Sequence, residues 1–314
     1  MSKALALAAL IAGGGCATLE DLSFSATPPD PASRVAPAAG AYPSVRSGCR
    51  CEAPSQPTGR FQRVLIIVLE NQDYERAMAD PYLGGLARQG ASFTNFHGLF
   101  HPSYSNYLAI VAGKEIRTLF DRQKDLEECT IGDLLKSKGL AWKNYAEGYP
   151  GSAGRCFTGS RAGRYERKHV PFMSFAPIQE HSCASIVDAA ELGADIATGR
   201  LPAYMFYSPD VDHDGHASGL AGASRWLRDF LEPLRADARF MDGTLIVVTF
   251  DESSRRSAHN HIYTVFLGPM VRPGNIDGNA NHYNVLRTIE DNFGLCPLGE
   301  GDAGARPITE AWKQ

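Results

Sequence analysis

Residues 64–69 read VLIIVL, and this uninterrupted apolar run ends at Glu70 and Asn71. A strand that is apolar at every position is typical of a parallel sheet covered by helices on both faces. Outward from this stretch, apolar runs of strand length alternate with helical patterns, which predicts an α/β fold with a mostly parallel central sheet. We expect further strands at 91–98, 140–147, 202–210, 244–252 and 262–269, and helices at 81–90, 103–113, 130–139, 186–199, 224–240 and 282–294.

The N-terminus has the features of an export signal. A short cationic start precedes the apolar run ALALAALIAGGG, which is too brief to span a bilayer. We interpret residues 1–16 as a signal peptide. Cys16 follows GGG as in bacterial lipoprotein signals, although Gly13 stands where that pattern has an aliphatic residue. The protein is therefore expected to be exported and to be periplasmic, extracellular or anchored to the bacterial envelope by a lipid on Cys16.

The rest of the chain divides in two. Residues 17–60 are rich in Pro, Ala, Ser and Gly and are predicted to be a flexible tether, whereas residues 61–314 carry the alternating apolar pattern of a folded domain. The net charge is -4, and the Lys and Arg residues are scattered without a basic stripe, which argues against nucleic acid as a partner.

The cysteines favour disulfide bonds. Besides Cys16 there are six, an even number, which in an exported chain is typical of disulfides; buried reduced thiols are the alternative. Two CxxC motifs at metal-binding spacing are lacking, so a zinc–thiolate site is disfavoured. The six are Cys49, Cys51, Cys129, Cys156, Cys183 and Cys296.

Acidic residues follow two of the predicted strands. Glu70-Asn71 end one strand, and Asp251-Glu252 end another. The carboxyl ends of parallel strands meet at one edge of the sheet, where the active sites of open α/β sheets lie. Burying such carboxylates without a cation costs on the order of several kcal/mol each, so we predict a divalent metal ion. The alternative is that the acids cap the following loop or pair with the arginines at 255–256.

A serine precedes the apolar helix NYLAIVAG. Pro102-Ser103 lead into this helix, whose N-terminal N–H groups and dipole favour an anion. A metal-bound hydroxyl loses its proton more readily and can attack phosphorus. Taken alone, Ser103 or Ser105 is more often an ordinary helix cap. The catalytic interpretation depends on the combination with the acidic strand ends.

A third cluster, DVDHDGH, occupies 210–216 directly after a predicted strand. Its carboxylates and imidazoles can bind a metal or supply a general acid, and a solvated Asp-rich turn is the alternative. Lys168-His169 and His282 are weak signals individually, but each lies in a segment that can reach the same edge of the sheet.

Together, these segments resemble the phosphoesterase family that includes bacterial acid phosphatases, phosphatidylinositol phosphatases and phospholipases C, within the alkaline phosphatase superfamily. The resemblance covers roughly Val64 to Leu295 and implies a three-layer sandwich like that of alkaline phosphatase, which makes 61–314 a catalytic domain. The matching segments are VLENQDYE, HPSYSNYLAIVAG, YERKHVPF, SPDVDHDGH, VVTFDE and HYNVLRTIEDNFGL.

The resemblance also implies roles for individual residues and a Cys156–Cys183 disulfide. Ser105 stands where many members have Pro, and Asp251-Glu252 stand where two-zinc relatives have an Asp-His pair. The metal is left open among Mg, Ca, Mn and Zn. The implied catalytic residues are Ser103, His169 and His216; the substrate contacts are Lys168, Asn106, Asp214 and His282; the metal ligands are Glu70, Asn71, Ser103, Asp251 and Glu252.

These expectations define a function. We predict a metal-dependent hydrolase of phosphate monoesters that works through a phosphoserine, with a phosphate-ester small molecule or a lipid head group as its partner. Phosphoinositides and nucleotides are candidate substrates. The alternatives are a phospholipase C-type phosphodiesterase and an inactive surface binding protein. The sequence does not predict the oligomeric state.

Overall fold

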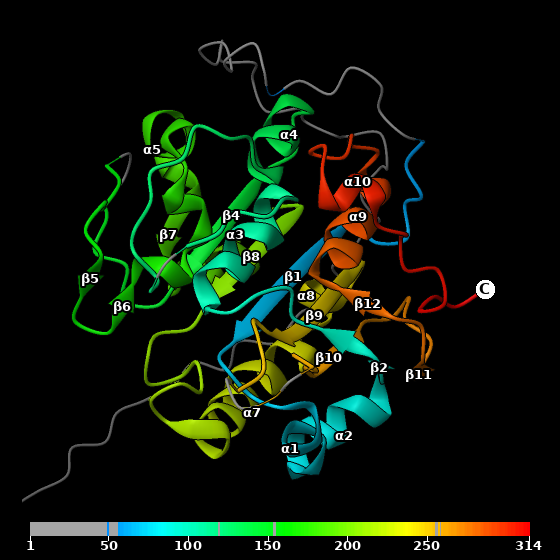
Figure 1. The fold of residues 1–314 in the computed structure, drawn as a ribbon. Helices are drawn as coiled ribbons and strands as arrows, with labels where there is room; N and C mark the ends of the chain where they lie inside the picture. The colour runs from blue at the N-terminus through cyan, green and yellow to red at the C-terminus, as the bar shows by residue number, and fades with distance from the viewer. Residues whose placement is uncertain (1–48, 50–55, 119, 153–154, 255–256, 258) are drawn as a thin grey trace, which may run out of the picture. The chain divides into compact units, whose positions relative to one another are not determined.

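An eight-stranded sheet forms the centre of the structure (Figure 1). The computed structural model describes residues 49, 56–118, 120–152, 155–254, 257 and 259–314. The predicted signal peptide, most of the predicted tether, and Arg255 and Arg256 lie outside the described residues.

The strands of this sheet lie in the order β11-β2-β10-β9-β1-β8-β4-β7, and only β10 runs antiparallel to its neighbours. The predicted mostly parallel α/β sheet is therefore confirmed. The strands are β1 (Arg63–Leu69), β2 (Ala91–Phe93), β4 (Trp142–Ala146), β7 (Ile186–Asp188), β8 (Tyr204–Ser208), β9 (Thr244–Phe250), β10 (Thr264–Leu267) and β11 (Gly274–Ile276). Two small sheets pair β3 (Phe96–His97) with β12 (Ala280–Asn281) and β5 (Arg161–Ala162) with β6 (Tyr165–Glu166).

Helices cover both faces of the sheet. In Figure 1, α3 and α9 lie on one side and α1, α2 and α7 on the other; α3 contacts α9, and α2 contacts α7. The α-helices are α1 (Tyr74–Ala79), α2 (Pro81–Gln89), α3 (Ser103–Ala112), α4 (Ile131–Ser137), α5 (Ala176–His181), α6 (Glu191–Ala197), α7 (Gly219–Ala236), α8 (Ala238–Met241), α9 (His282–Phe293) and α10 (Gly301–Gly304). Three 3₁₀ turns are η1 (Arg167–His169), η2 (Pro171–Ser174) and η3 (Cys183–Ser185).

The two central strands are buried as their sequences predict. Every residue of β9 is buried, and so is every residue of β1 except Arg63. Burying a Val, Leu or Ile side chain contributes about 1.5–3 kcal/mol, so these strands supply much of the driving force for folding. Their register pairs Leu69 with Phe250, which places the residues that follow at the same height on one edge of the sheet.

Two predicted helices differ from the structure. The first third of the expected 186–199 helix is not helical: Ile186–Asp188 pair with β4 as strand β7, and helix α6 begins only at Glu191. Ile186 and Val187 are β-branched and pair with the open edge of β4. This tertiary pairing is not visible in the helical periodicity of the sequence. The expected 224–240 helix also breaks, because the extended Asp237 ends α7 and its side chain accepts from the Arg239 N–H that opens α8.

Disulfides link segments outside the strands of the central sheet. Cys156 is bonded to Cys183, as the family resemblance implied, and Cys49 is bonded to Cys129; Cys296 is disulfide-bonded as well. The Cys156–Cys183 bond spans a sequence separation of 27 residues. In the loop-entropy model such a bond stabilises the fold by about 3 kcal/mol. Within the described part of the chain, no helix combines the length and the apolar character needed to span a membrane.

A buried carboxyl pair lies away from the sheet edge. Glu290 in α9 is fully buried, and its neighbour is Asp302 in α10. Burial raises the pKa of Glu290 to about 10, with the Asp302 charge as the second cause, so Glu290 is protonated at neutral pH. The Asp302 carboxylate itself accepts the backbone N–H groups of Leu298, Gly299 and Glu300.

Replacing Glu290 by Gln should flatten the pH dependence of folding stability. The folded pKa of Glu290 lies above its ordinary value of 4.5, so its stabilising contribution is fully present below that value and is lost as pH rises toward 10. Between about pH 5 and about pH 8, the difference in unfolding free energy should shift in favour of Glu290→Gln by on the order of 1–3 kcal/mol. Urea unfolding at both pH values measures this shift; parallel pH curves for the two proteins would contradict it.

Candidate active site

Three carboxylates are buried where β1 and β9 end. Glu70 follows β1, and Asp251 and Glu252 follow β9; their side chains are 0 %, 0 % and 1 % exposed. The Asp251 N–H donates to the Leu69 carbonyl at 2.9 Å, which extends the strand pairing beyond β9 and fixes the backbone beneath these acids. The paired strand ends therefore bring the predicted acids together.

Asn71 turns back toward the same acids. Its φ of +56° lies in the left-handed region, which Asn adopts more readily than most residues. In this conformation its N–H donates to Asp251 Oδ1 at 2.9 Å, and its side-chain Nδ2 donates to Glu70 Oε2 at 2.7 Å. Asn71 thus bridges the ends of the two strands.

The hydroxyl of Ser103 lies among these groups. Its Oγ is 3.1 Å from Glu252 Oε1 and 3.4 Å from both Glu70 Oε2 and Asn71 Oδ1. Ser105 points elsewhere, because its Oγ contacts Thr118 Oγ1 at 3.2 Å and accepts the Thr118 N–H at 3.1 Å. Ser103, and not Ser105, is therefore the serine that faces the acids.

His169 joins Glu70 to Asp214. Its Nε2 is 3.0 Å from Glu70 Oε1, and its Nδ1 is 3.4 Å from Asp214 Oδ2. Burial alone disfavours the charged form of Glu70. The electrostatic effects of His169 and, to a smaller extent, Lys168 outweigh burial and hold the pKa of Glu70 below its usual range. Burial raises the pKa of Asp214 to about 7. Gly215 has a φ of +99°, a conformation that lets the chain turn directly after Asp214.

Lys168 reaches the site beside Asp121. Its Nζ is 3.3 Å from Asp121 Oδ2. Burial disfavours its charge, but the Glu70 and Asp121 carboxylates outweigh burial and raise the pKa of Lys168. Asp121 also accepts the Tyr104 N–H at 3.1 Å. This helix-terminal N–H, which the sequence offered for anion binding, is occupied by a carboxylate in the structure.

His282 opens α9 beneath Asp251. Its ring Nε2 is 2.8 Å from the Asp251 carbonyl oxygen. Because a carbonyl oxygen can only accept, Nε2 carries the hydrogen and donates this hydrogen bond. Burial lowers the pKa of His282 to about 4. His282 is therefore neutral and holds the backbone of the β9 end.

Two predicted site residues do not face the acids. The carboxamide oxygen of Asn106 accepts the N–H groups of Leu99 and Phe100 at 2.9 and 3.0 Å, and its Nδ2 donates to the Phe100 carbonyl. Being fully buried, Asn106 holds the loop before Ser103 and offers no surface to a substrate. The His216 side chain is exposed, and its backbone N–H donates to Asp214 Oδ1 at 2.7 Å.

Three residues near the site have no part in the sequence-based prediction. His101 Nδ1 lies 2.6 Å from Glu252 Oε2, and the ring of Tyr107 stacks on His169 with centroids 5.3 Å apart. Asp121 is the third. His101 and Tyr107 lie on either side of Ser103 in HPSYSNY, and this proximity in sequence could have identified them as site residues. Asp121 follows no strand, so no comparable pattern predicts its place near the site.

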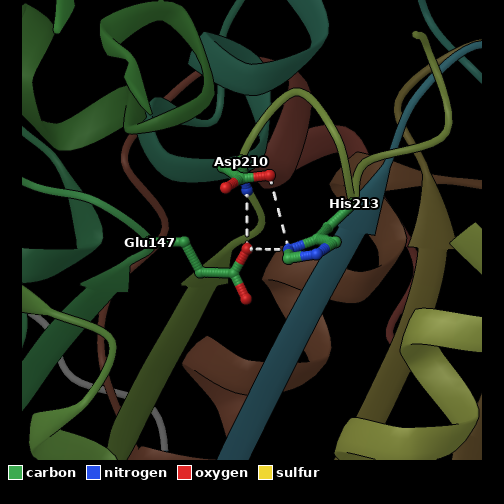
Figure 2. Close-up of side chains that lie close together, drawn as sticks. All are labelled: Glu147, Asp210 and His213. Carbon is green, nitrogen blue, oxygen red and sulfur yellow. Dashed lines mark hydrogen bonds and ion pairs between the residues drawn. The ribbon is translucent and has the colours of Figure 1, made fainter. Parts of the chain in front are cut away.

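A separate acidic group lies at the ends of β4 and β8. Glu147, Asp210 and His213 each offer a ligand atom within 4.8 Å of one another, and Figure 2 shows their side chains converging. The predicted 210–216 cluster is thus divided, because Asp210 and His213 face Glu147 whereas Asp214 faces His169. Glu147 ends a strand as Glu70 does, and this signal in AWKNYAE could have identified it.

This second group is satisfied by its own neighbours. Glu147 Oε2 accepts from the Asp210 N–H and is 2.6 Å from His213 Nδ1, while its Oε1 accepts from the Tyr207 hydroxyl and the Trp226 indole. The group therefore has hydrogen-bond partners without a cation. It is an acidic group of the kind that can hold a metal ion, but the oxygens of Glu147 already accept hydrogen bonds from protein groups.

The Glu70–Asp251 group is not satisfied by its neighbours in this way. Asp251 Oδ2 is buried and has no hydrogen-bond partner among the described residues. Burial raises the pKa of Asp251 well above its usual range, and the Glu70 and Glu252 charges add to the increase. A divalent cation would offset this excess of negative charge, and carboxylate, amide and hydroxyl oxygens are the donors that hard cations prefer. The residues present fit such an ion.

The comparisons with known proteins identify this α/β protein as a hydrolase of phosphoric esters. Residues 72–296 match the model of the Phosphoesterase family, and the chain belongs to that family. It is 33% identical to a probable acid phosphatase of Kluyveromyces lactis over 95% of this chain and 75% of that protein. It is also 33% identical to a phosphatidylinositol-3-phosphatase of Mycobacterium tuberculosis, over 90% of this chain and 91% of that one.

A solved structure agrees with the fold. A protein of the alkaline phosphatase superfamily from Vibrio parahaemolyticus superposes with a TM-score of 0.57, at 14% sequence identity, over 82% of this chain and 72% of that chain. The expected resemblance to alkaline phosphatase is therefore confirmed at the level of the fold.

Replacing Asn106 by Ala should destabilise the loop before Ser103. The N–H groups of Leu99 and Phe100 lose their acceptor, which should lower the free energy of unfolding by about 1–3 kcal/mol. The matched control is Asn275→Ala, because Asn275 is exposed on the edge strand β11 and should change stability by less than about 0.5 kcal/mol. Denaturant unfolding compares the two, and equal effects would refute this role of Asn106.

Proposed function

We propose that the protein is a metal-dependent phosphomonoesterase that works through a phosphoserine at Ser103. The observation that carries this proposal is the position of Ser103 Oγ, within 3.1–3.4 Å of oxygens from Glu70, Asn71 and Glu252. A hydroxyl is seldom surrounded by buried acids for packing alone, since it can donate only one hydrogen bond. The arrangement is suited to a nucleophile at a cation site.

The metal ligands would be Glu70, Asn71, Ser103, Asp251 and Glu252. When bound, a divalent ion supplies positive charge that favours the ionised serine and offsets charge on the phosphoryl oxygens. A set made of oxygen donors favours Mg, Ca or Mn over Zn.

The reaction proceeds in two displacements. Ser103 Oγ gives up its proton and attacks phosphorus, the ester P–O bond breaks, and the leaving alkoxide takes up a proton, so the step has no net gain or loss of protons. Water then attacks the phosphoserine, which releases inorganic phosphate and restores the Ser103 hydroxyl. Lys168 and the Asn71 Nδ2 supply positive charge and a donor for the non-bridging oxygens, where charge develops.

Other residues act by positioning. His169, held between Asp214 and Glu70, keeps the Glu70 carboxylate oriented toward Ser103. His282 supports the backbone of Asp251. Such neighbours fix the orientation of metal ligands and the protonation of catalytic groups.

The substrate is a phosphate monoester in this proposal. Relatives called acid phosphatases support it, and the relative called a phosphatidylinositol-3-phosphatase supports phosphoinositides as one candidate. The disulfides Cys49–Cys129 and Cys156–Cys183 favour an oxidising compartment and hence export. Cleavage of residues 1–16 and a lipid on Cys16 remain part of the proposal.

Ser103→Ala should abolish hydrolysis of a phosphate monoester, whereas Ser105→Ala should retain it. The expected loss in kcat for Ser103→Ala is about 10³-fold or more, because the attacking oxygen is removed. The two serines lie two positions apart on α3, so Ser105→Ala controls for disturbance of the helix. Trapping of phosphate on Ser103 at low pH, read by mass spectrometry, gives a direct check. Near-normal turnover by Ser103→Ala would eliminate this serine as nucleophile.

Chelation should remove activity, and one divalent ion should restore it. The loss of the ion leaves Glu70, Asp251 and Glu252 buried together, so chelated protein should also melt at a lower temperature. A series of Mg, Ca, Mn and Zn additions, followed by both turnover and thermal unfolding, identifies the ion. Full activity and unchanged melting after exhaustive chelation would rule out a metal enzyme.

A further inference from the structure

A cavity with a volume of about 950 Å³ opens beside the N-terminal end of α3. Most of its exposed wall surface is apolar, and Leu99, Phe100, Pro102 and Phe120 are its apolar residues. Its polar residues are His101, Ser105, Arg117, Thr118, Ser257 and Asn260. The sites that bind small molecules are typically cavities of this size, lined by apolar groups with a few polar ones. The cavity is therefore large enough for an organic group of moderate size.

The cavity wall is connected to the proposed nucleophile. His101 and Pro102 directly precede Ser103 in the chain. His101 Nδ1 is 2.6 Å from one oxygen of Glu252, and Ser103 Oγ is 3.1 Å from the other. The Glu252 carboxylate thus contacts both Ser103 and one residue of the cavity wall, which makes this cavity a neighbour of the proposed nucleophile.

Phe120 is unusual in its exposure. Its side chain is 86 % exposed, and it is the only large apolar side chain of the described residues that is exposed. A planar ring placed against it would remove apolar surface from water and gain aromatic contact. The next residue, Asp121, contacts both Lys168 and the first turn of α3, which places Phe120 at a defined position relative to the site.

The charged groups of the wall are already paired. Arg117 forms an ion pair with Glu115, and His101 is paired with Glu252. The Arg117–Glu115 pair is exposed to solvent and contributes little, whereas His101 is held by the buried Glu252 carboxylate. Because most of the exposed wall surface is apolar, the cavity favours an uncharged group over a second phosphate or a carboxylate.

We propose that this cavity receives the alcohol part of the substrate and that Phe120 selects phosphate monoesters whose alcohol carries an uncharged planar ring. Aryl and nucleoside monophosphates belong to this class, whereas glycerol phosphate lacks the ring. The inference rests on the proposed phosphomonoesterase function, and it adds a determinant of substrate choice.

The test measures the selectivity ratio, which is kcat/KM for phenyl phosphate divided by kcat/KM for glycerol phosphate. Phe120→Ala should lower this ratio about three- to tenfold, mainly through a higher KM for phenyl phosphate. Phe120→Trp, which keeps an aromatic ring, should retain the ratio. An unchanged ratio in Phe120→Ala, or an equal ratio loss in both variants, would overturn the proposal.

A second measurement does not require turnover. Ser103→Ala should bind phenyl phosphate more tightly than glycerol phosphate in isothermal titration, and adding Phe120→Ala should remove about three- to tenfold of that preference. If the wild-type protein hydrolyses neither ester, the proposed function fails, and this titration alone decides whether the cavity prefers a ring. Equal affinities for the two esters would overturn the ring preference.

Discussion

The structure depends on burying three carboxylates at the ends of two neighbouring parallel strands. The register that pairs Leu69 with Phe250 is fixed by apolar side chains along β1 and β9, and it forces Glu70, Asp251 and Glu252 into one unexposed place. Such burial opposes folding unless positive charge is nearby. Much of the surrounding architecture can be understood as the supply of that charge.

Loops supply this positive charge. The Cys156–Cys183 disulfide encloses the segment that carries Lys168 and His169, so both side chains lie on a covalently restrained loop. His169 contacts Glu70 and Asp214 together. The acids therefore determine where this loop must lie, and the disulfide limits the entropy lost in placing it there.

The sequence predicted the sheet and the acids well because strand burial and strand-end polarity are local patterns. VLIIVL and TLIVVTF identify buried strands, and the residues after them identify the edge. Side-chain direction was not accessible. Asn106 turns to the loop backbone and His216 to solvent, although both lie in motifs that matched the family. Asp121 contacts Lys168 only in the folded structure, and no sequence pattern around it predicts this contact. Strand β7 forms only because β4 offers an open edge for pairing.

The two outermost strands of the sheet, β7 and β11, have three residues each. An edge this short presents few unpaired N–H and C=O groups to another chain, and Pro273 directly before β11 has no N–H to offer. The sheet can thus keep a long, strongly apolar centre without becoming a template for intermolecular pairing. The short edge strands β7 and β11 therefore contribute to resistance against aggregation.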